Sequence, residues 1–200
     1  SQYRRLSAQP SVKSACPFHT KCKDLKMLDE TTQGVFTIAA TPFLPDGALD
    51  FDSLDRLTDA YIEKGADGLT ILGMMGEAGK LSAAESIAVI KRVTARSTVT
   101  VVVGVSAPGL AAMKMLSTEA MQMGAAGVMV APPMGLRTDA QIIGYFQNVA
   151  AALGDIPFVL QDFPLASGVQ ISTSVILEIV ETCPTCVMLK HEDWPGLEKI

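Results

Sequence analysis

The sequence lacks the features of a membrane protein and of a nucleic-acid-binding protein. Its apolar runs, such as residues 99–105 and 128–131, are far shorter than the roughly 18 residues that a membrane-spanning helix needs. Acidic side chains outnumber basic ones by 21 to 16, and the net charge of −5 provides no positive field for nucleic acid or anionic lipid. We therefore expect a small-molecule partner, no nucleic acid, no membrane and a cytoplasmic location.

Cysteine is also scarce. Four cysteines in 200 residues do not form the dense disulfide framework of a small secreted domain. Cys183 and Cys186 form a C-x-x-C motif, and Cys16 and Cys22 flank His19 near the start of the sequence. These side chains would bind zinc only if the tail folded onto the distant motif, so we favour reduced thiols and predict no metal and no cofactor.

The first 33 residues are predicted to form an arm that is separate from the folded domain. Residues 1–23 contain five basic side chains, several serines and no acidic side chain, a composition typical of a disordered arm or of an organellar transit segment. We favour a disordered or extended arm over residues 1–33, followed by one barrel domain over residues 34–200. Import into an organelle is the alternative reading of the same composition.

Short runs rich in β-branched residues recur from residue 35 onward, at intervals of 28–33 residues. Each run is continuously apolar, as expected for a parallel strand that is covered on both faces. The runs begin near Val35, Gly68, Val99, Gly127, Pro157 and Cys186.

The segments between these runs have helical periodicity. Ser82 with Glu85, and Thr138 with Gln141, have the spacing of capping boxes at helix starts. The pattern predicts helices over residues 51–64, 82–96, 109–123, 138–151 and 172–181.

Strict alternation of strands and helices predicts an α/β fold, either an open doubly wound sheet or a closed TIM (β/α)8 barrel. A nucleotide-binding sheet carries a glycine fingerprint after its first strand, and residues 41–47, Thr-Pro-Phe-Leu-Pro-Asp-Gly, do not form one. The sequence therefore favours the barrel. Closure needs eight strand and helix units, and only about six are visible, so we expect a barrel truncated after its sixth strand.

Functional residues of such folds lie at the C-terminal ends of the strands. Lys190 ends the sixth apolar run, and if Met188 points into the barrel, period-two alternation points Lys190 the same way. A dry environment there favours the neutral amine, which is the nucleophile that condenses with a ketone. The alternative is a lysine that ends a strand and extends its amine to water.

Six motifs follow one another along the sequence, most of them at strand ends. They are Thr-Pro-Phe at residues 41–43 with a following Asp-Gly, Gly-x-x-Gly-Glu at 73–77, Gly-Ala-x-Gly, Pro-Pro, a strand ending in x-x-Phe-Pro, and a strand ending in Lys190. From about Gly34 to the last residue, this order resembles the dihydrodipicolinate synthase and N-acetylneuraminate lyase family. The resemblance implies a class I lyase or aldolase in which Lys190 forms a Schiff base with a pyruvate-type 2-oxo acid.

The resemblance also implies a role for the loop that follows the second strand. In the family this loop holds the substrate carboxylate with two hydroxyl residues and backbone N–H groups, and two methionines replace the hydroxyl residues here. Methionines make the pocket softer and more apolar, which indicates a substrate with a less polar body, unless both simply fill the barrel mouth. The predicted substrate-binding residues are Gly73, Met74, Met75, Gly76, Thr41 and Phe163.

Gln161 stands where the family places a proton-transferring tyrosine. A glutamine amide only donates and accepts hydrogen bonds, so we expect Gln161 to orient a carboxylate or a water molecule. The sequence leaves the proton carrier open among Asp162, Glu192, His191, a water molecule and the substrate's own carboxylate. With Lys190, Gln161 and Asp162 complete the predicted catalytic residues.

Ala166 stands where the resemblance places the arginine of true dihydrodipicolinate synthases, which disfavours lysine biosynthesis. We expect a lyase or aldolase of a 2-oxo acid. The alternatives are a dehydratase of a 2-oxo-3-deoxy sugar acid and a non-catalytic barrel that binds a 2-oxo acid. Because members of the family usually form dimers or tetramers, the resemblance also implies a homodimer or homotetramer.

Overall fold

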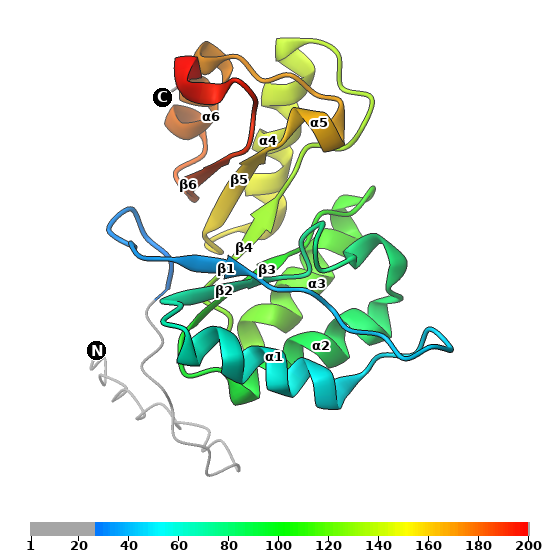
Figure 1. Ribbon diagram of the computed structural model, residues 1–200. Helices are drawn as coiled ribbons and strands as arrows, with labels where there is room; N and C mark the ends of the chain where they lie inside the picture. Colours follow the sequence, from blue (N-terminus) through cyan, green and yellow to red (C-terminus); the bar gives the residue numbers. More distant parts are fainter. Residues whose placement is uncertain (1–26, 200) are drawn as a thin grey trace, which may run out of the picture.

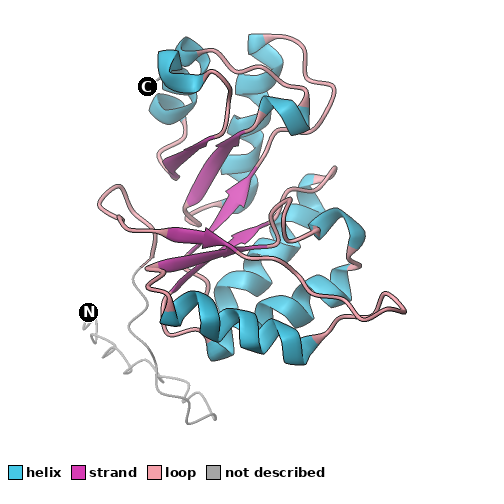
Figure 2. Ribbon diagram, in the orientation of Figure 1, coloured by secondary structure: helices cyan, strands magenta, loops and turns pink. Residues whose placement is uncertain are grey.

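The computed structural model describes residues 27–199 and contains one curled sheet of six parallel strands. The strands are hydrogen-bonded in the order in which they occur in the sequence. Helices cover the outer side of the curled sheet, and its inner side faces the centre (Figures 1 and 2). This is the predicted α/β barrel architecture, present over six units. The strands are Phe36–Ile38 (β1), Gly68–Ile71 (β2), Thr100–Gly104 (β3), Gly127–Val130 (β4), Phe158–Asp162 (β5) and Cys186–His191 (β6).

Five helices fall within two residues of their predicted bounds, and both predicted capping boxes are present. These helices are Phe51–Glu63 (α1), Ala83–Arg96 (α2), Leu110–Gln122 (α3), Asp139–Leu153 (α4) and Thr173–Thr182 (α6). None of the described helices is long and apolar enough to cross a membrane. Three short helices were not predicted, namely Ala78–Lys80 (η1), Pro164–Ser167 (α5) and Gly196–Lys199 (η2).

Alternation along the strands separates two apolar layers. The outer layer packs between the sheet and the helices and includes Leu69, Val101, Val103, Val128, Val130, Phe158 and Leu160. The inner layer contains Val102, Met129 and Val159, with Phe36 and Met188 packed against it. Neighbouring residues of one strand therefore face different surroundings, which decides the direction of each side chain at the strand ends.

Leu28 covers the N-terminal end of the inner layer. It is buried, and its N–H donates to the carbonyl oxygen of Ala126 at 2.8 Å. A Cβ on Gly127, the first residue of β4, would lie 2.7 Å from Leu28 Cδ1, so glycine makes room for this contact. Of the predicted arm, residues 1–26 lie outside the described residues. The boundary at residue 34 stays a prediction.

Candidate active site

A cavity of about 420 Å³ lies at the C-terminal ends of β2 to β5. The loop after β2 contributes most of its wall, and the strand ends contribute the rest. The lining is mainly apolar, as is common for pockets that bind small molecules. Its residues include Gly73, Met74, Glu77, Lys80, Gly104, Ser106, Met129, Ala131 and Gln161.

The backbone of the loop after β2 is held in a conformation that few sequences allow. Leu72 and Glu77 adopt left-handed backbone angles, with φ of +54° and +53°. A Cβ on Gly104 of β3 would lie 2.2 Å from the carbonyl oxygen of Leu72, so only glycine permits this approach. From the end of β1, the buried hydroxyl of Thr41 donates to the carbonyl oxygen of Gly76 at 2.7 Å. Thr41 and Gly76 therefore shape the loop.

The structure separates the two methionines that the sequence placed together. Met74 is 43% exposed and lines the cavity, whereas Met75 is 63% exposed and is not part of the lining. Gly73 lines the cavity next to Met74, and Phe163 lies beyond the end of β5, where it caps the start of α5. Of the two methionines, Met74 is thus the one that contributes an apolar side chain to the cavity wall.

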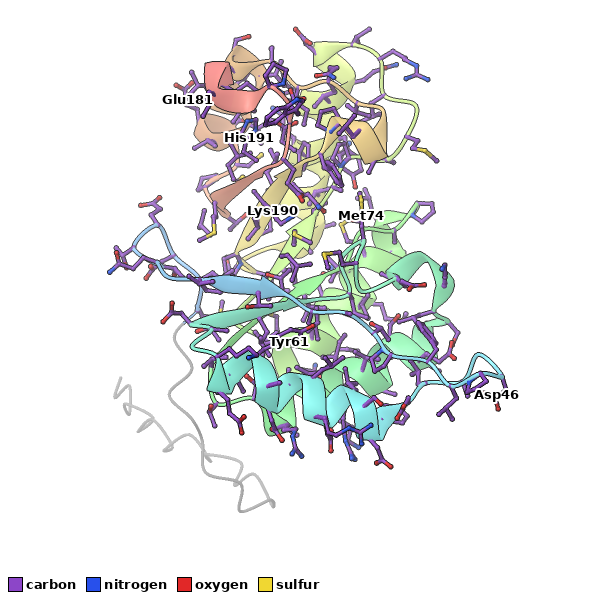
Figure 3. All side chains as sticks on the ribbon, viewed as in Figure 1. Asp46, Tyr61, Met74, Glu181, Lys190 and His191 are labelled. Atoms are coloured by element: carbon purple, nitrogen blue, oxygen red, sulfur yellow. The ribbon has the colours of Figure 1, made fainter. Side chains whose placement is uncertain are left out.

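Lys190 points to the inner side of the sheet, as alternation with Met188 predicted. Both residues line a second cavity of about 210 Å³ between the strands. Met129 lines both cavities, which therefore adjoin at one side chain. The Lys190 side chain is 23% exposed. Figure 3 shows the positions of Lys190 on β6 and of Met74 on the loop after β2.

Glu192 contacts both the Lys190 amine and Gln161, which lines the larger cavity. Its Oε1 atom forms an ion pair with Lys190 Nζ and accepts a hydrogen bond of 2.7 Å from the amide of Gln161. Gln161 and Lys190 are register partners on β5 and β6. The sequence offered Glu192 only as one of several proton carriers. Glu192 follows Lys190 by two residues, and side chains two residues apart in a strand point to the same face. This spacing is the sequence signal that could have placed Glu192 beside Lys190.

Asp162 and His191 lie on the opposite face of the same strand pair. Asp162 is fully buried, and its Oδ2 atom lies 3.0 Å from His191 Nδ1 and 3.0 Å from Lys199 Nζ. Burial alone lowers the pKa of Lys199, but its hydrogen bonds to Asp193 and Asp162 raise it above the ordinary value. The structure does not bring the Asp162 carboxylate together with Lys190, because successive residues of β5 point to opposite sides.

The C-x-x-C motif lies away from this site, after α6. Cys183 and Cys186 are both buried and unoxidised. Burial raises the pKa of the Cys186 thiol to about 12, and the nearby Cys183 adds to the shift. The other half of the zinc alternative, Cys16, His19 and Cys22, lies outside the described residues.

A sequence model described as the dihydrodipicolinate synthetase family matches residues 31–193. The chain belongs to this family. The resemblance inferred from the order of strand-end motifs is therefore confirmed, and the match extends over all six strands.

Individual members of the family agree with this assignment. A 4-hydroxy-tetrahydrodipicolinate synthase of Sorangium cellulosum is 36% identical over 160 residues, which are 78% of this chain and 53% of that protein. The crystal structure of dihydrodipicolinate synthase from Rhodopseudomonas palustris is 54% identical, with a TM-score of 0.84 over 87% of this chain and 58% of that chain. An Acinetobacter baumannii dihydrodipicolinate synthase complexed with pyruvate is 28% identical, with a TM-score of 0.73 over 79% and 55% of the two chains. The chain spans about half the length of the curated relatives that it matches.

Proposed function

We propose that the protein is a lyase that acts on a 2-oxo acid through a Schiff base on Lys190. The observation that carries this proposal is the position of the amine, at the inner side of β6 and linked through Glu192 and Gln161 to the larger cavity. A relative that was crystallised with pyruvate supports a pyruvate-type substrate. The whole reaction needs neither a metal nor an organic cofactor, because the amine itself provides the electrophile.

The proposed chemistry begins with addition of the neutral Lys190 amine to the ketone carbon of the 2-oxo acid. Loss of the ketone oxygen as water leaves a cationic imine. When the C3–C4 bond of a 4-hydroxy-2-oxo acid breaks, its electron pair moves toward this cation and forms an enamine, while the 4-hydroxyl loses its proton and becomes an aldehyde. Protonation of the enamine at C3 and hydrolysis by water then release the shorter 2-oxo acid and restore Lys190.

The cavity wall favours a substrate whose body is less polar than that of true dihydrodipicolinate synthases. Met74 contributes a thioether to the wall, and Gly73 lines the cavity beside it without a side chain. Ala166, the position of the family's arginine, is an exposed residue of α5 and offers no charge to a second carboxylate. We therefore propose a 2-oxo acid whose far end carries no second carboxylate.

Trapping with borohydride tests this function in the full-length protein. Incubation with pyruvate and sodium borohydride should reduce the imine to a stable amine, and peptide mass spectrometry should find one added pyruvate on Lys190. The Lys190→Arg variant should give no adduct, and Lys114→Arg, on the exposed side of α3, should give the wild-type amount. If wild-type protein acquires no adduct at Lys190, the Schiff-base proposal is wrong.

Product analysis then separates the lyase from its two alternatives. A panel of 4-hydroxy-2-oxo acids and 2-oxo-3-deoxy sugar acids is incubated with the protein. Cleavage releases an aldehyde and pyruvate, whereas dehydration releases only water and keeps the carbon chain intact. An adduct without any product from either class of acid would favour a barrel that binds a 2-oxo acid without turnover.

We also propose that the protein forms a homodimer or homotetramer. Met134, in the loop after β4, and Leu165, in α5, are 82% and 79% exposed in the single chain. Members of the family usually form dimers or tetramers, and a neighbouring subunit would cover such apolar side chains. Light scattering on the full-length protein tests this proposal, and a monomer at micromolar concentration would contradict it.

A further inference from the structure

One carboxylate oxygen, Oε1 of Glu192, contacts both the Lys190 amine and the Gln161 amide. We propose that Glu192 is the catalytic residue that transfers protons at this site, a proposal that rests on the proposed Schiff base at Lys190. We further propose that Gln161 is its positioning residue. The pair takes over the proton transfer that a glutamine at position 161 cannot perform alone.

The other carboxylates near the strand ends are paired with partners other than Lys190. Asp162 and His191 bind each other on the outer face of the sheet, as described above. Glu77, in the wall of the larger cavity, forms an ion pair with Lys80. Among residues 27–199, Glu192 is thus the carboxylate that the structure brings to the reacting nitrogen.

Gln161 fixes the direction of this carboxylate. It is 4% exposed at the end of β5, and its amide donates to Glu192 across the strand pair. The Glu192 backbone N–H also donates to the carbonyl oxygen of Asp162 at 2.8 Å, which continues the β5–β6 ladder for one further residue. Glu192 is therefore held by its backbone and by its side chain, and a buried amide defines one orientation of the carboxylate.

During imine formation, Glu192 first accepts a proton and later donates it. The Lys190 ammonium gives one proton to Glu192, and the neutral amine adds to the ketone carbon. A second proton passes from the nitrogen to the former ketone oxygen, which gives a neutral carbinolamine. Glu192 then donates its proton to this hydroxyl, and water leaves as the C=N bond forms. The carboxylate ends beside the cationic imine, whose charge it neutralises.

The same carboxylate serves the cleavage step. As the C3–C4 bond breaks, Glu192 accepts the proton of the 4-hydroxyl, and the electron pair of the broken bond moves to form the enamine. Glu192 then returns this proton to C3, which restores the imine. One carboxylate beside the amine therefore supplies both proton transfers that a retro-aldol reaction needs.

The test measures how fast the pyruvate adduct forms on Lys190 in full-length protein with Glu192→Ala or Glu192→Gln. Loss of a general acid and base typically slows a reaction by about 100-fold or more, so both variants should trap pyruvate at least about 100-fold more slowly. The KM for pyruvate should change little. Glu181→Ala removes an exposed carboxylate of α6 far from the amine (Figure 3) and should match the wild type.

Chemical rescue distinguishes proton transfer from a purely structural role. Added formate or acetate should restore part of the rate of Glu192→Ala, because a small carboxylate can occupy the space that the side chain leaves. The same acids should not restore Gln161→Leu, which keeps Glu192 and should lose about 10-fold in kcat through misplacement of the carboxylate. If the Ala variant does not fold, the isosteric Gln variant decides the question by its rate alone.

The outcomes separate this proposal from the one on which it rests. If Lys190→Arg abolishes the adduct while Glu192→Ala and Glu192→Gln form it at the wild-type rate, Glu192 is not the proton carrier and the Schiff base still stands. A loss of rate that no carboxylate restores in a folded Glu192→Ala variant would also overturn the proposal. Absence of any adduct in the wild type would overturn both.

Discussion

Asp162 and His191 are paired across β5 and β6, with Oδ2 of Asp162 lying 3.0 Å from Nδ1 of His191. The pair lies on the outer face of the strands, one residue along from Gln161 and Lys190, which lie on the inner face. Lys199 donates to the same Oδ2 atom, so the buried carboxylate ties the short helix η2 to β5. This arrangement is an anchor for the segment that follows the proposed catalytic residues.

Replacing this anchor should lower the stability of the protein. In Asp162→Asn the side chain keeps its shape but loses the charge that His191 and Lys199 contact, which should cost about 1–3 kcal/mol. Urea denaturation of the full-length protein measures the change. The exposed Asp155→Asn serves as the control and should stay within about 0.5 kcal/mol of the wild type. Equal stability of the two variants would contradict a structural role for Asp162.

The close approach of β3 to the loop after β2 predicts a second effect on stability. Gly104→Ala would place a Cβ 2.2 Å from the Leu72 carbonyl oxygen, and a backbone atom in a strand end cannot move aside easily. We expect a loss of about 1–3 kcal/mol. Gly144→Ala is the matched control, because nothing lies within 4 Å of its added Cβ inside α4. That variant should gain about 0.5–1 kcal/mol, since alanine favours a helix interior over glycine.

The contact between α1 and α2 predicts a dependence of stability on pH. Arg92 donates to both oxygens of Asp55 at 2.7 Å, and Arg96 contacts the same carboxylate at 3.1 Å. The hydrogen bond from Arg92 holds the pKa of Asp55 below its ordinary value of 3.8. A carboxylate with a lowered pKa stabilises the fold above its unfolded pKa, and this contribution disappears as the pH falls through the folded pKa.

Asp55→Asn should therefore be less stable than the wild type at pH 7, and the difference should shrink as the pH falls below about 3.8. Urea unfolding at a series of pH values measures the two free energies. High salt at pH 7 should reduce the same difference, because these side chains are partly exposed and ions screen the attraction. A difference that stays constant from pH 7 to pH 2 would rule out the ion pairs as its source.

The strands and helices could be predicted from the sequence because each is determined by local patterns. Ser82 with Glu85 and Thr138 with Gln141 identify helix starts through contacts three residues apart, and the continuous apolar runs identify strands that are buried on both faces. The direction of Lys190 followed from the same alternation. All of these features depend on residues that are close together in the sequence.

The details of the site depend on contacts between distant segments, and the sequence alone did not reveal them. Nothing near Asp162 in the sequence indicates that Lys199 binds it, because 37 residues separate the two. Neighbouring methionines look equivalent in the sequence, yet only Met74 lines the cavity. The contact between Gln161 and Glu192 likewise joins two strands, and it depends on the register that pairs Gln161 of β5 with Lys190 of β6.

The buried C-x-x-C motif predicts slow thiol chemistry. Because burial raises the pKa of Cys186 to about 12, almost none of this thiol is the reactive thiolate at pH 8. In the native protein, Cys186 should resist alkylation by iodoacetamide, and in guanidinium chloride it should react at the rate of a free cysteine. Peptide mass spectrometry reports the modification at each site. Rapid native labelling of Cys186 would show that the segment after α6 opens readily.

The positions of Met74 and Met75 predict which residue of the loop after β2 affects substrate selectivity. Met74 lines the cavity and Met75 does not, so polarity at position 74 should affect the substrate, and polarity at position 75 should affect mainly solvent contacts. Met74→Thr adds a hydroxyl to the apolar wall. A site that hydrogen-bonds a substrate hydroxyl rejects substrates that lack this hydroxyl more strongly than an apolar site does. The reason is that the polar group of the site then stays buried without a partner.

We expect Met74→Thr to shift the ratio of kcat/KM for a polyhydroxylated 2-oxo acid over an alkyl or aryl one by about 10-fold or more, in favour of the polar substrate. Met75→Thr makes the same chemical change one residue away and should shift the ratio much less. The measurement compares kcat/KM for both substrates in the wild type and in the two variants. If Met75→Thr changes the ratio as much as Met74→Thr, the substrate contacts the outer side of the loop, and the cavity at the ends of β2 to β5 is not where its body binds.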